Sequence, residues 1–106
     1  MLINNNALYG DIKMPAERKR DRLQVIHDIL KSIQEKDGRI RPTNILYKAN
    51  LSPQMLNEYL KELIEKGMIK ENSSKEGKTY SLEKKGFEFL AKYKTITEFL
   101  ETFGLD

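Results

Sequence analysis

The first third of the chain has apolar residues at helical spacing, followed by a turn. Between residues 17 and 36 they fall within one wide stripe of a helical wheel, which predicts an amphipathic helix. Asp37-Gly38 ends this helix, and Arg39-Ile40-Arg41 is long enough only for a bridge-like strand. The apolar stripe consists of Leu23, Val25, Ile26, Ile29, Leu30 and Ile33.

Two short helices with a brief break between them are predicted next. Pro42 suits the first turn of one helix, because its missing N–H costs nothing there. Ser52 is a good N-cap for the other helix, Pro53 opens it, and Gly67 supplies a left-handed stop. The residues expected to face inward are Ile45, Leu46 and Ala49 in the first helix and Met55, Leu56, Tyr59, Leu60, Leu63 and Ile64 in the second.

After Gly67 the spacing of apolar residues is no longer helical. Residues 68–70 and 79–82 are expected to form two short strands, and the polar residues 71–78 the loop between them. The order helix, strand, helix, helix, hairpin is that of a winged helix. We therefore predict a mainly α fold with a small β-hairpin (α+β). It comprises an N-terminal extension at 1–16, a winged helix-turn-helix domain at 17–82 and a long C-terminal helix at 83–104.

A narrow apolar seam marks the last helix and predicts a homodimer. The seam residues recur at the alternating spacing of a coiled coil, and an isolated protomer would expose them as a large apolar patch. Phe87 and Leu90 are expected to anchor the same helix to its own domain. Burial of the seam against the protomer itself, or beneath apolar residues of the leading segment, is the alternative. The expected dimerisation residues are Phe89, Tyr93, Ile96, Phe99, Leu100 and Phe103.

Composition narrows the classes of function. With 39% hydrophobic and 33% charged residues, a chain of 106 residues fits one globular domain. It has no cysteine, one histidine and no phosphate-binding glycine loop, so we expect no enzyme, no metal site and no cofactor. The histidine, His27, is expected to be a partly buried structural residue. No apolar run approaches the roughly 20 residues that span a bilayer, and we expect a cytoplasmic, nucleoid-associated protein without membrane contact.

Positive charge is concentrated in the first half of the chain. The net charge is only +3, but Arg18, Lys19, Arg20 and Arg22 form a cluster, and residues 39–51 include no acidic residue. For binding a polyanion, such a local excess of positive charge matters more than the net charge of the whole chain. The distribution favours a nucleic-acid partner, and a surface charged only for solubility or for life at high temperature is the alternative.

Three segments carry a resemblance to a known family. They are residues 47–52 (YKANLS), 63–69 (LIEKGMI) and 80–86 (YSLEKKG), and they resemble signatures of archaeal winged helix-turn-helix DNA-binding proteins. Over residues 18–103 the chain is most similar to small crenarchaeal chromatin-type proteins that dimerise through a C-terminal coiled-coil helix. It departs from them in a longer wing that contains Ser and Glu and in a shorter last helix. The resemblance implies double-stranded DNA binding by a homodimeric transcriptional regulator.

The chemistry of this scaffold indicates which residues contact DNA. A helix in the major groove reads base edges, while basic groups and backbone amides hold phosphates. Gln54 and Asn57 carry amides suited to adenine, and Lys61 can reach a guanine or a phosphate. Ser52 lies at a helix N-terminus, which favours a phosphate. The other expected contacts are Arg39, Arg41, Thr43 and Lys48 near the DNA backbone, and Lys75 and Lys78 on the wing, for phosphates or the minor groove.

Acidic residues on the expected recognition helix leave alternatives open. Glu62 and Glu65 can face solvent, but Glu58 lies on the exposed side and would repel phosphates. It either accepts a cytosine amino group, or pairs with Lys61 or Lys66, or belongs to a surface that binds protein. A protein-interaction winged helix without DNA binding is therefore one alternative function. A chromatin architectural protein with little sequence preference is another.

Overall fold

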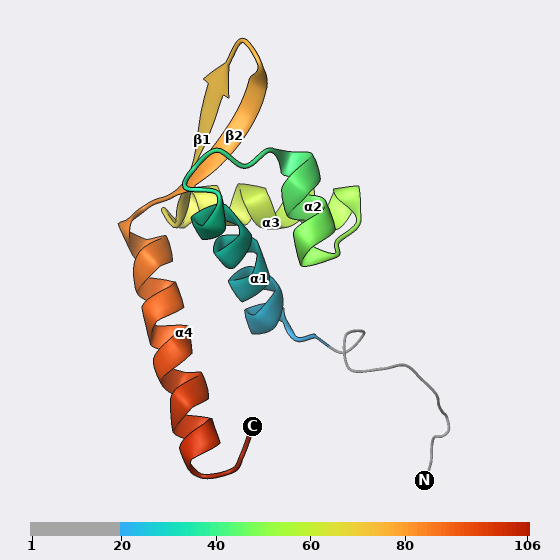
Figure 1. Cartoon of the computed structure of the whole chain (residues 1–106). Coiled ribbons are helices and arrows are strands. Elements are labelled where there is room, and N and C mark those ends of the chain that lie inside the picture. Colours follow the sequence, from blue (N-terminus) through green and yellow to red (C-terminus); the bar gives the residue numbers. More distant parts are fainter. Residues whose placement is uncertain (1–19) are drawn as a thin grey trace, which may run out of the picture.

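The computed structural model describes residues 20–106. The expected extension at 1–16 and the basic residues Arg18 and Lys19 lie outside this part. The predicted winged helix-turn-helix with a long last helix is confirmed (Figure 1). The elements in chain order are α1 (Arg22–Glu35), α2 (Pro42–Ala49), α3 (Pro53–Glu65), β1 (Ile69–Ser74), β2 (Gly77–Leu82) and α4 (Lys84–Thr102).

Helix α1 begins at Arg22, later than the expected start near residue 17, because a capping box fixes its first turn. The Asp21 carboxylate accepts a hydrogen bond from the backbone N–H of Gln24 at 2.9 Å. In return the Gln24 side chain accepts one from the backbone N–H of Asp21 at 3.1 Å. Two N–H groups that have no partner within the helix are thereby satisfied. The helix ends at Glu35, before Asp37-Gly38 as predicted.

The turn between α2 and α3 and the end of α3 follow the predicted capping. The Ser52 hydroxyl accepts a hydrogen bond from the backbone N–H of Met55 at 3.2 Å, and Pro53 opens α3. Asn50 closes α2 in the left-handed conformation, with φ of 55°. Gly67 has φ of 74°, and this allows the following Met68 N–H to reach the carbonyl of Leu63 at 2.9 Å.

The hairpin is longer than expected, and the prediction of a loop over residues 71–78 is wrong. Strands β1 and β2 pair in antiparallel register from Ile69 opposite Leu82 to Ser74 opposite Gly77, so that only two residues form the turn. Gly77, with φ of 119°, and the Ser74 hydroxyl, which accepts from the Glu76 N–H at 3.2 Å, shape this turn. Residues 71–78 are polar and mostly exposed, so no alternation of apolar and polar residues marked this part of the hairpin in the sequence.

A third short segment joins the hairpin. Ile40 forms a bridge with Tyr80 of β2, as expected for a bridge-like strand, and the Tyr80 N–H donates to the Ile40 carbonyl at 3.1 Å. The Tyr80 hydroxyl donates to Glu71 of β1 at 3.3 Å. Burial raises the pKa of Tyr80, and the neighbouring Glu71 carboxylate raises it further. The phenol therefore keeps its proton, and this hydrogen bond, through neutral pH.

The core lies where α1, α2, α3 and the base of the hairpin meet. Fully buried aliphatic side chains of this kind each stabilise the fold by about 1.5–3 kcal/mol. Leu23, Met55 and Ile64 were expected inside but are exposed, because they lie at the margins of their helical stripes. The largest fully buried side chains are Ile29, Leu30, Ile33, Ile40, Ile45 and Leu63.

Helix α4 packs on α1 with its first half only. Leu90 is buried, and the Tyr93 ring stacks on His27 of α1 with 4.1 Å between ring centroids. Phe87 was expected to anchor the helix but is mostly exposed, and Phe89 packs against the core in its place. The hairpin projects from one end of the molecule, and the second half of α4 extends past α1 toward the other (Figure 1).

Gly86 in the first turn of α4 is required by close packing. A Cβ at this position would collide with the backbone carbonyl of Met68. We expect Gly86→Ala to lower the free energy of unfolding by about 1–3 kcal/mol, as for other overpacked positions. Intrinsic helix propensity alone would make Gly86→Ala stabilising by about 1 kcal/mol. A lower free energy of unfolding would therefore show that the collision with Met68 outweighs helix propensity.

Thermal unfolding followed by circular dichroism measures this change. Glu88→Ala, an exposed substitution two residues further along α4, is the control and should alter the melting temperature little. A Gly86→Ala protein more stable than the unmodified chain would contradict the packing described for α4 and Met68.

Candidate nucleic-acid interface

The two flanks of α3 face different parts of the protein. One flank meets α1, where Arg22 pairs with Glu62 and its guanidinium carbon lies 5.8 Å from the centroid of the Tyr59 ring. The opposite flank meets the base of the hairpin, where Ile64 lines a shallow groove together with Ile69 and Lys70 of β1. The outer side of α3 therefore has an α1 flank and a hairpin flank.

The residues expected to read bases lie toward the hairpin flank. Asn57, Lys61 and Ile64 follow one another at steps of four and three residues, which places them on one side of an α-helix. Gln54 lies one turn before Asn57 and two turns before Lys61. The side chains of Gln54, Asn57 and Lys61 are all exposed. The structure therefore brings three of the expected contacts onto one free surface beside the hairpin.

The acidic residues of α3 lie mainly toward the α1 flank. The Arg22 guanidinium lowers the pKa of Glu62 by hydrogen bonding and charge, so Glu62 is ionised and paired. Glu58 lines a small groove with Arg22 and Glu62, and it accepts a hydrogen bond from Gln54 Nε2 at 3.4 Å. The ion pairs of the described residues include none between Glu58 and a lysine. The negative charge of Glu62 is thus paired on the α1 flank, whereas Glu58 and Glu65 each lie within one turn of Lys61.

Arginine side chains continue the basic surface along the hairpin. Arg39 and Arg41 flank Ile40, and because side chains alternate along extended backbone they point away from its buried side. The Nη1 atom of Arg41 lies 3.7 Å from the position that a Cβ on Gly77 would take, next to the turn of the hairpin. Arg41 therefore connects the start of α2 with the wing.

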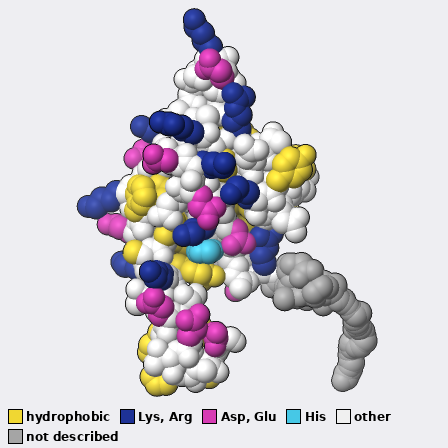
Figure 2. All heavy atoms as spheres, in the orientation of Figure 1, with side chains coloured by type: hydrophobic (Ala, Val, Ile, Leu, Met, Phe, Trp, Pro, Cys, Tyr) yellow, Lys and Arg dark blue, Asp and Glu magenta, His cyan; other side chains and the backbone are white. Residues whose placement is uncertain are grey.

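The wing itself ends in basic side chains. Lys75 is exposed in the two-residue turn. Lys78 is exposed on β2, where its amino group lies 3.6 Å from Glu71. Figure 2 shows basic side chains reaching the far tip of the hairpin. The tip is thus a projecting, positively charged element.

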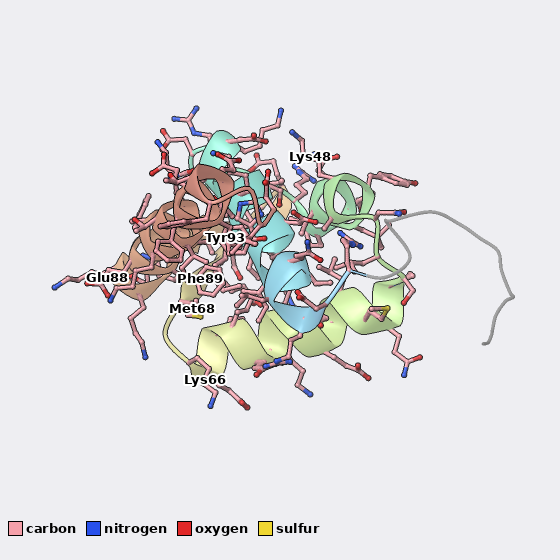
Figure 3. The ribbon with its side chains drawn as sticks, turned by 90° about the horizontal axis from the view of Figure 1, so that it is seen from below. Lys48, Lys66, Met68, Glu88, Phe89 and Tyr93 are labelled. Atoms are coloured by element: carbon pink, nitrogen blue, oxygen red, sulfur yellow. The ribbon has the colours of Figure 1, made fainter. Side chains whose placement is uncertain are left out.

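Lys48, Thr43 and Ser52 have different surroundings. Lys48 lies on the side of the molecule opposite α3, as Figure 3 shows, and its amino group pairs with Glu35 at 3.3 Å. The structure therefore does not bring it to the surface formed by α3 and the wing. Thr43 is exposed in the first turn of α2, and Ser52 is exposed at the start of α3.

Arg20 has a positioning role that the sequence did not reveal. Its guanidinium donates to Asp28 of α1 at 2.7 Å and to the backbone carbonyl of Asn50 at 3.1 Å. It thereby ties the turn between α2 and α3 to α1. In the sequence Arg20 was one member of a basic cluster, and no local spacing indicates a contact with a residue 30 positions away.

The seam of α4 is divided into two parts. Phe89 and Tyr93 contact their own protomer, which agrees with the alternative of burial within the protomer for this half. Ile96, Phe99 and Phe103 remain exposed, at 52%, 59% and 62% of their accessible surface. Leu100, within the second part, is half-buried. The second half of α4 thus presents an apolar stripe to solvent.

Two further kinds of feature are absent from the described residues. No helix among them combines the length and the apolar character needed to cross a lipid bilayer. Residues 20–106 also contain no group of three or more His, Asp or Glu side chains arranged to hold a metal ion.

Comparisons with known proteins agree with the observed order of elements. The chain is similar in structure to Sso10a-2, a DNA-binding protein from Sulfolobus solfataricus, with a TM-score of 0.68 and 19% identity over 79% of this chain and 85% of that chain. It is also similar to SSV1 F-93, with a TM-score of 0.59 and 24% identity over 74% of this chain and 91% of that one. A variant of MepR from S. aureus has a TM-score of 0.67 and 16% identity, covering 74% of this chain and 60% of its own. These likenesses show the fold.

At the level of sequence, no curated protein matches the chain. A family model described as winged helix-turn-helix matches residues 19–101, which is most of the chain. The family predicted from residues 47–52, 63–69 and 80–86 is thus confirmed. The chain belongs to the winged helix-turn-helix family.

Proposed function

We propose that this protein binds double-stranded DNA with α3 in the major groove and the wing on the backbone or in the minor groove. The observation that carries this proposal is the shared surface of α3 and the hairpin. There Gln54, Asn57 and Lys61 are exposed, while Glu62 is paired with Arg22 on the other flank. The likeness to Sso10a-2, described as a DNA-binding protein, supports it.

Each side chain of this surface has a role that fits its chemistry. The amides of Gln54 and Asn57 can donate to and accept from the major-groove edge of adenine. The exposed amino group of Lys61 can reach a guanine or a phosphate. Arg41 and Lys75, along the hairpin and at its tip, would neutralise phosphates or enter the minor groove.

We further propose that the protein is a homodimer joined through the exposed stripe of α4. A fully buried aromatic side chain covers about 150–250 Å², so Phe99 and Phe103 with Ile96 approach the largest apolar patches usual on monomers. A second copy of the stripe has the same chemistry and would cover it. Two α3 helices on one twofold axis could then engage successive half-sites of a pseudo-palindrome, as in a transcriptional regulator.

Salt dependence tests the DNA-binding proposal. Each lysine or arginine that neutralises a phosphate releases a counterion, so the logarithm of affinity should fall steeply with the logarithm of salt concentration. We expect Arg41→Ala and Lys75→Ala each to flatten this slope by about one unit. Fluorescence anisotropy with a labelled duplex between about 50 and 200 mM salt measures it.

Lys48→Ala provides a matched control for the two substitutions. It removes the same charge from the side of the molecule opposite α3, so it should leave the slope unchanged. A duplex affinity that does not respond to salt, or to either of the two hairpin substitutions, would contradict the proposal. Such a result would favour a winged helix that binds protein.

A further inference from the structure

A groove of about 600 Å³ lies between α1 and α4, away from the surface proposed to bind DNA. Its volume is within the range of about 300–1,000 Å³ that is usual for small-molecule sites. On the α4 side it is lined by Leu90, Lys94, Thr97 and Glu101, which follow one another at steps of four and three residues and so form one face of the helix. The groove therefore follows one face of α4 from its packed first half into its second half.

The apolar part of the groove is largely aromatic. Phe87, Leu90 and Tyr93 contribute from α4, and the His27 ring stacks on Tyr93 with an angle of 20° between the ring planes. Burial is the main cause that raises the pKa of Tyr93, so its ring is neutral. Figure 2 shows the histidine at the surface beside a patch of apolar side chains. The flat apolar part of a ligand could therefore pack against these side chains.

The charged residues of the groove are mostly basic. Lys31 of α1 and Lys94 of α4 line it, and neither pairs with a carboxylate in residues 20–106. The Lys31 amino group donates to the Gln34 side chain at 3.4 Å, which leaves its charge uncompensated. Glu101 is the carboxylate among the lining residues, and it lies two helical turns, about 10 Å, from Lys94 along α4. Two ammonium groups beside an apolar wall favour an anion with an apolar body.

The groove is not the surface proposed for the dimer. Ile96 and Phe103 are seven residues apart on one side of α4, whereas Lys94 and Glu101 are seven apart on another. A second copy of α4 on the exposed stripe would therefore leave the groove open. Neither the DNA-binding proposal nor the dimer proposal uses its residues.

We propose that this groove binds a small aromatic carboxylate, with its ring against Phe87, Leu90 and Tyr93 and its carboxylate held by Lys31 and Lys94. Lys31 belongs to α1 and Lys94 to α4, so the ligand bridges the DNA-binding domain and the last helix. The proposal concerns binding alone, and it stands whether or not the protein binds DNA.

Isothermal titration of the full chain with 2-naphthoate tests the site, and 2-naphthamide serves as the neutral analogue of the same shape. We expect the carboxylate to bind about tenfold more tightly than the amide, because hydrogen bonds to a charged group are stronger than neutral ones. Lys31→Gln and Lys94→Gln should each weaken naphthoate by about five- to tenfold and leave naphthamide unchanged. Both positions are exposed, and the melting temperature of each variant verifies that it folds.

Lys92→Gln is the matched control, because Lys92 does not line the groove. It loses the same charge two residues from Lys94 and should bind naphthoate as the unmodified chain does. Equal affinities for naphthoate and naphthamide would overturn the proposal. So would an equal loss in Lys92→Gln and Lys94→Gln, or the absence of binding at millimolar naphthoate.

Discussion

Ile96→Glu is expected to convert the protein into a monomer of 12.4 kDa in solution. Ile96 is half exposed in the protomer and begins the exposed apolar stripe of α4, between the packed first half of the helix and the aromatic pair Phe99 and Phe103. A carboxylate there would be buried without a partner in the dimer but solvated in the monomer. We expect the dimer to be weakened at least about a hundredfold, in the range of a hot-spot residue.

Light scattering at micromolar concentration measures this effect. Lys94→Glu places a carboxylate two residues before Ile96 on the groove side of α4, outside the exposed stripe, and should leave the dimer intact. Duplex binding should weaken in Ile96→Glu, because two linked half-sites are bound more tightly than one. An unmodified chain that is monomeric at this concentration would contradict the dimer proposal without affecting the proposed contacts of α3.

Lys61→Glu is expected to abolish most of the affinity for duplex DNA. Lys61 is exposed on the side of α3 nearest the hairpin, and Glu58 and Glu65 lie within one turn of it. The reversal would remove a phosphate or guanine contact and add a third carboxylate to this surface. We expect a loss of about a hundredfold at moderate salt, which corresponds to about 2.7 kcal/mol.

Lys48→Glu carries the same reversal of charge on the opposite side of the molecule and serves as the control. Fluorescence anisotropy with one labelled duplex compares the two variants. Equal losses in both would mean that only the overall charge of the protein matters. Unchanged affinity in Lys61→Glu would exclude α3 as the element in the groove.

The features that the sequence predicted well are those encoded by neighbouring residues. Ser52, Pro53 and Gly67 mark the ends of α3 through local capping chemistry, and the structure has them in these roles. The buried stripe of α1 was visible because its apolar residues recur at helical spacing. The order of such local elements was enough to predict the winged helix.

The features that were missed depend on contacts between distant residues. The length of the hairpin was hidden because residues 71–74 pair with 77–80 through backbone hydrogen bonds that polar side chains do not reveal. Glu62 pairs with Arg22, which lies 40 positions away in the sequence. This pairing compensates one of the acidic charges on α3. The position of Lys48 on the side opposite α3 could not be predicted either, because it depends on how α2 packs on α1.

The individual contacts with DNA stay predictions. The structure places Gln54, Asn57 and Lys61 on a common exposed surface, but base recognition depends on the sequence of the duplex as well as on the side chains. The two proposed activities also use separate residues. The surface of α3 and the wing is distinct from the groove of Lys31 and Lys94, so each can be altered without the other.

Titration of the isotopically labelled full chain with a short duplex, followed by amide chemical shifts, tests the central claim most directly. The proposed surface predicts that the largest shifts fall between Gln54 and Lys61 of α3, at the turn of the hairpin and near Arg41, with little change at Lys48 or along the groove between α1 and α4. Shifts confined to the α1 flank of α3 or to α4, or no shifts at a saturating excess of duplex, would contradict it.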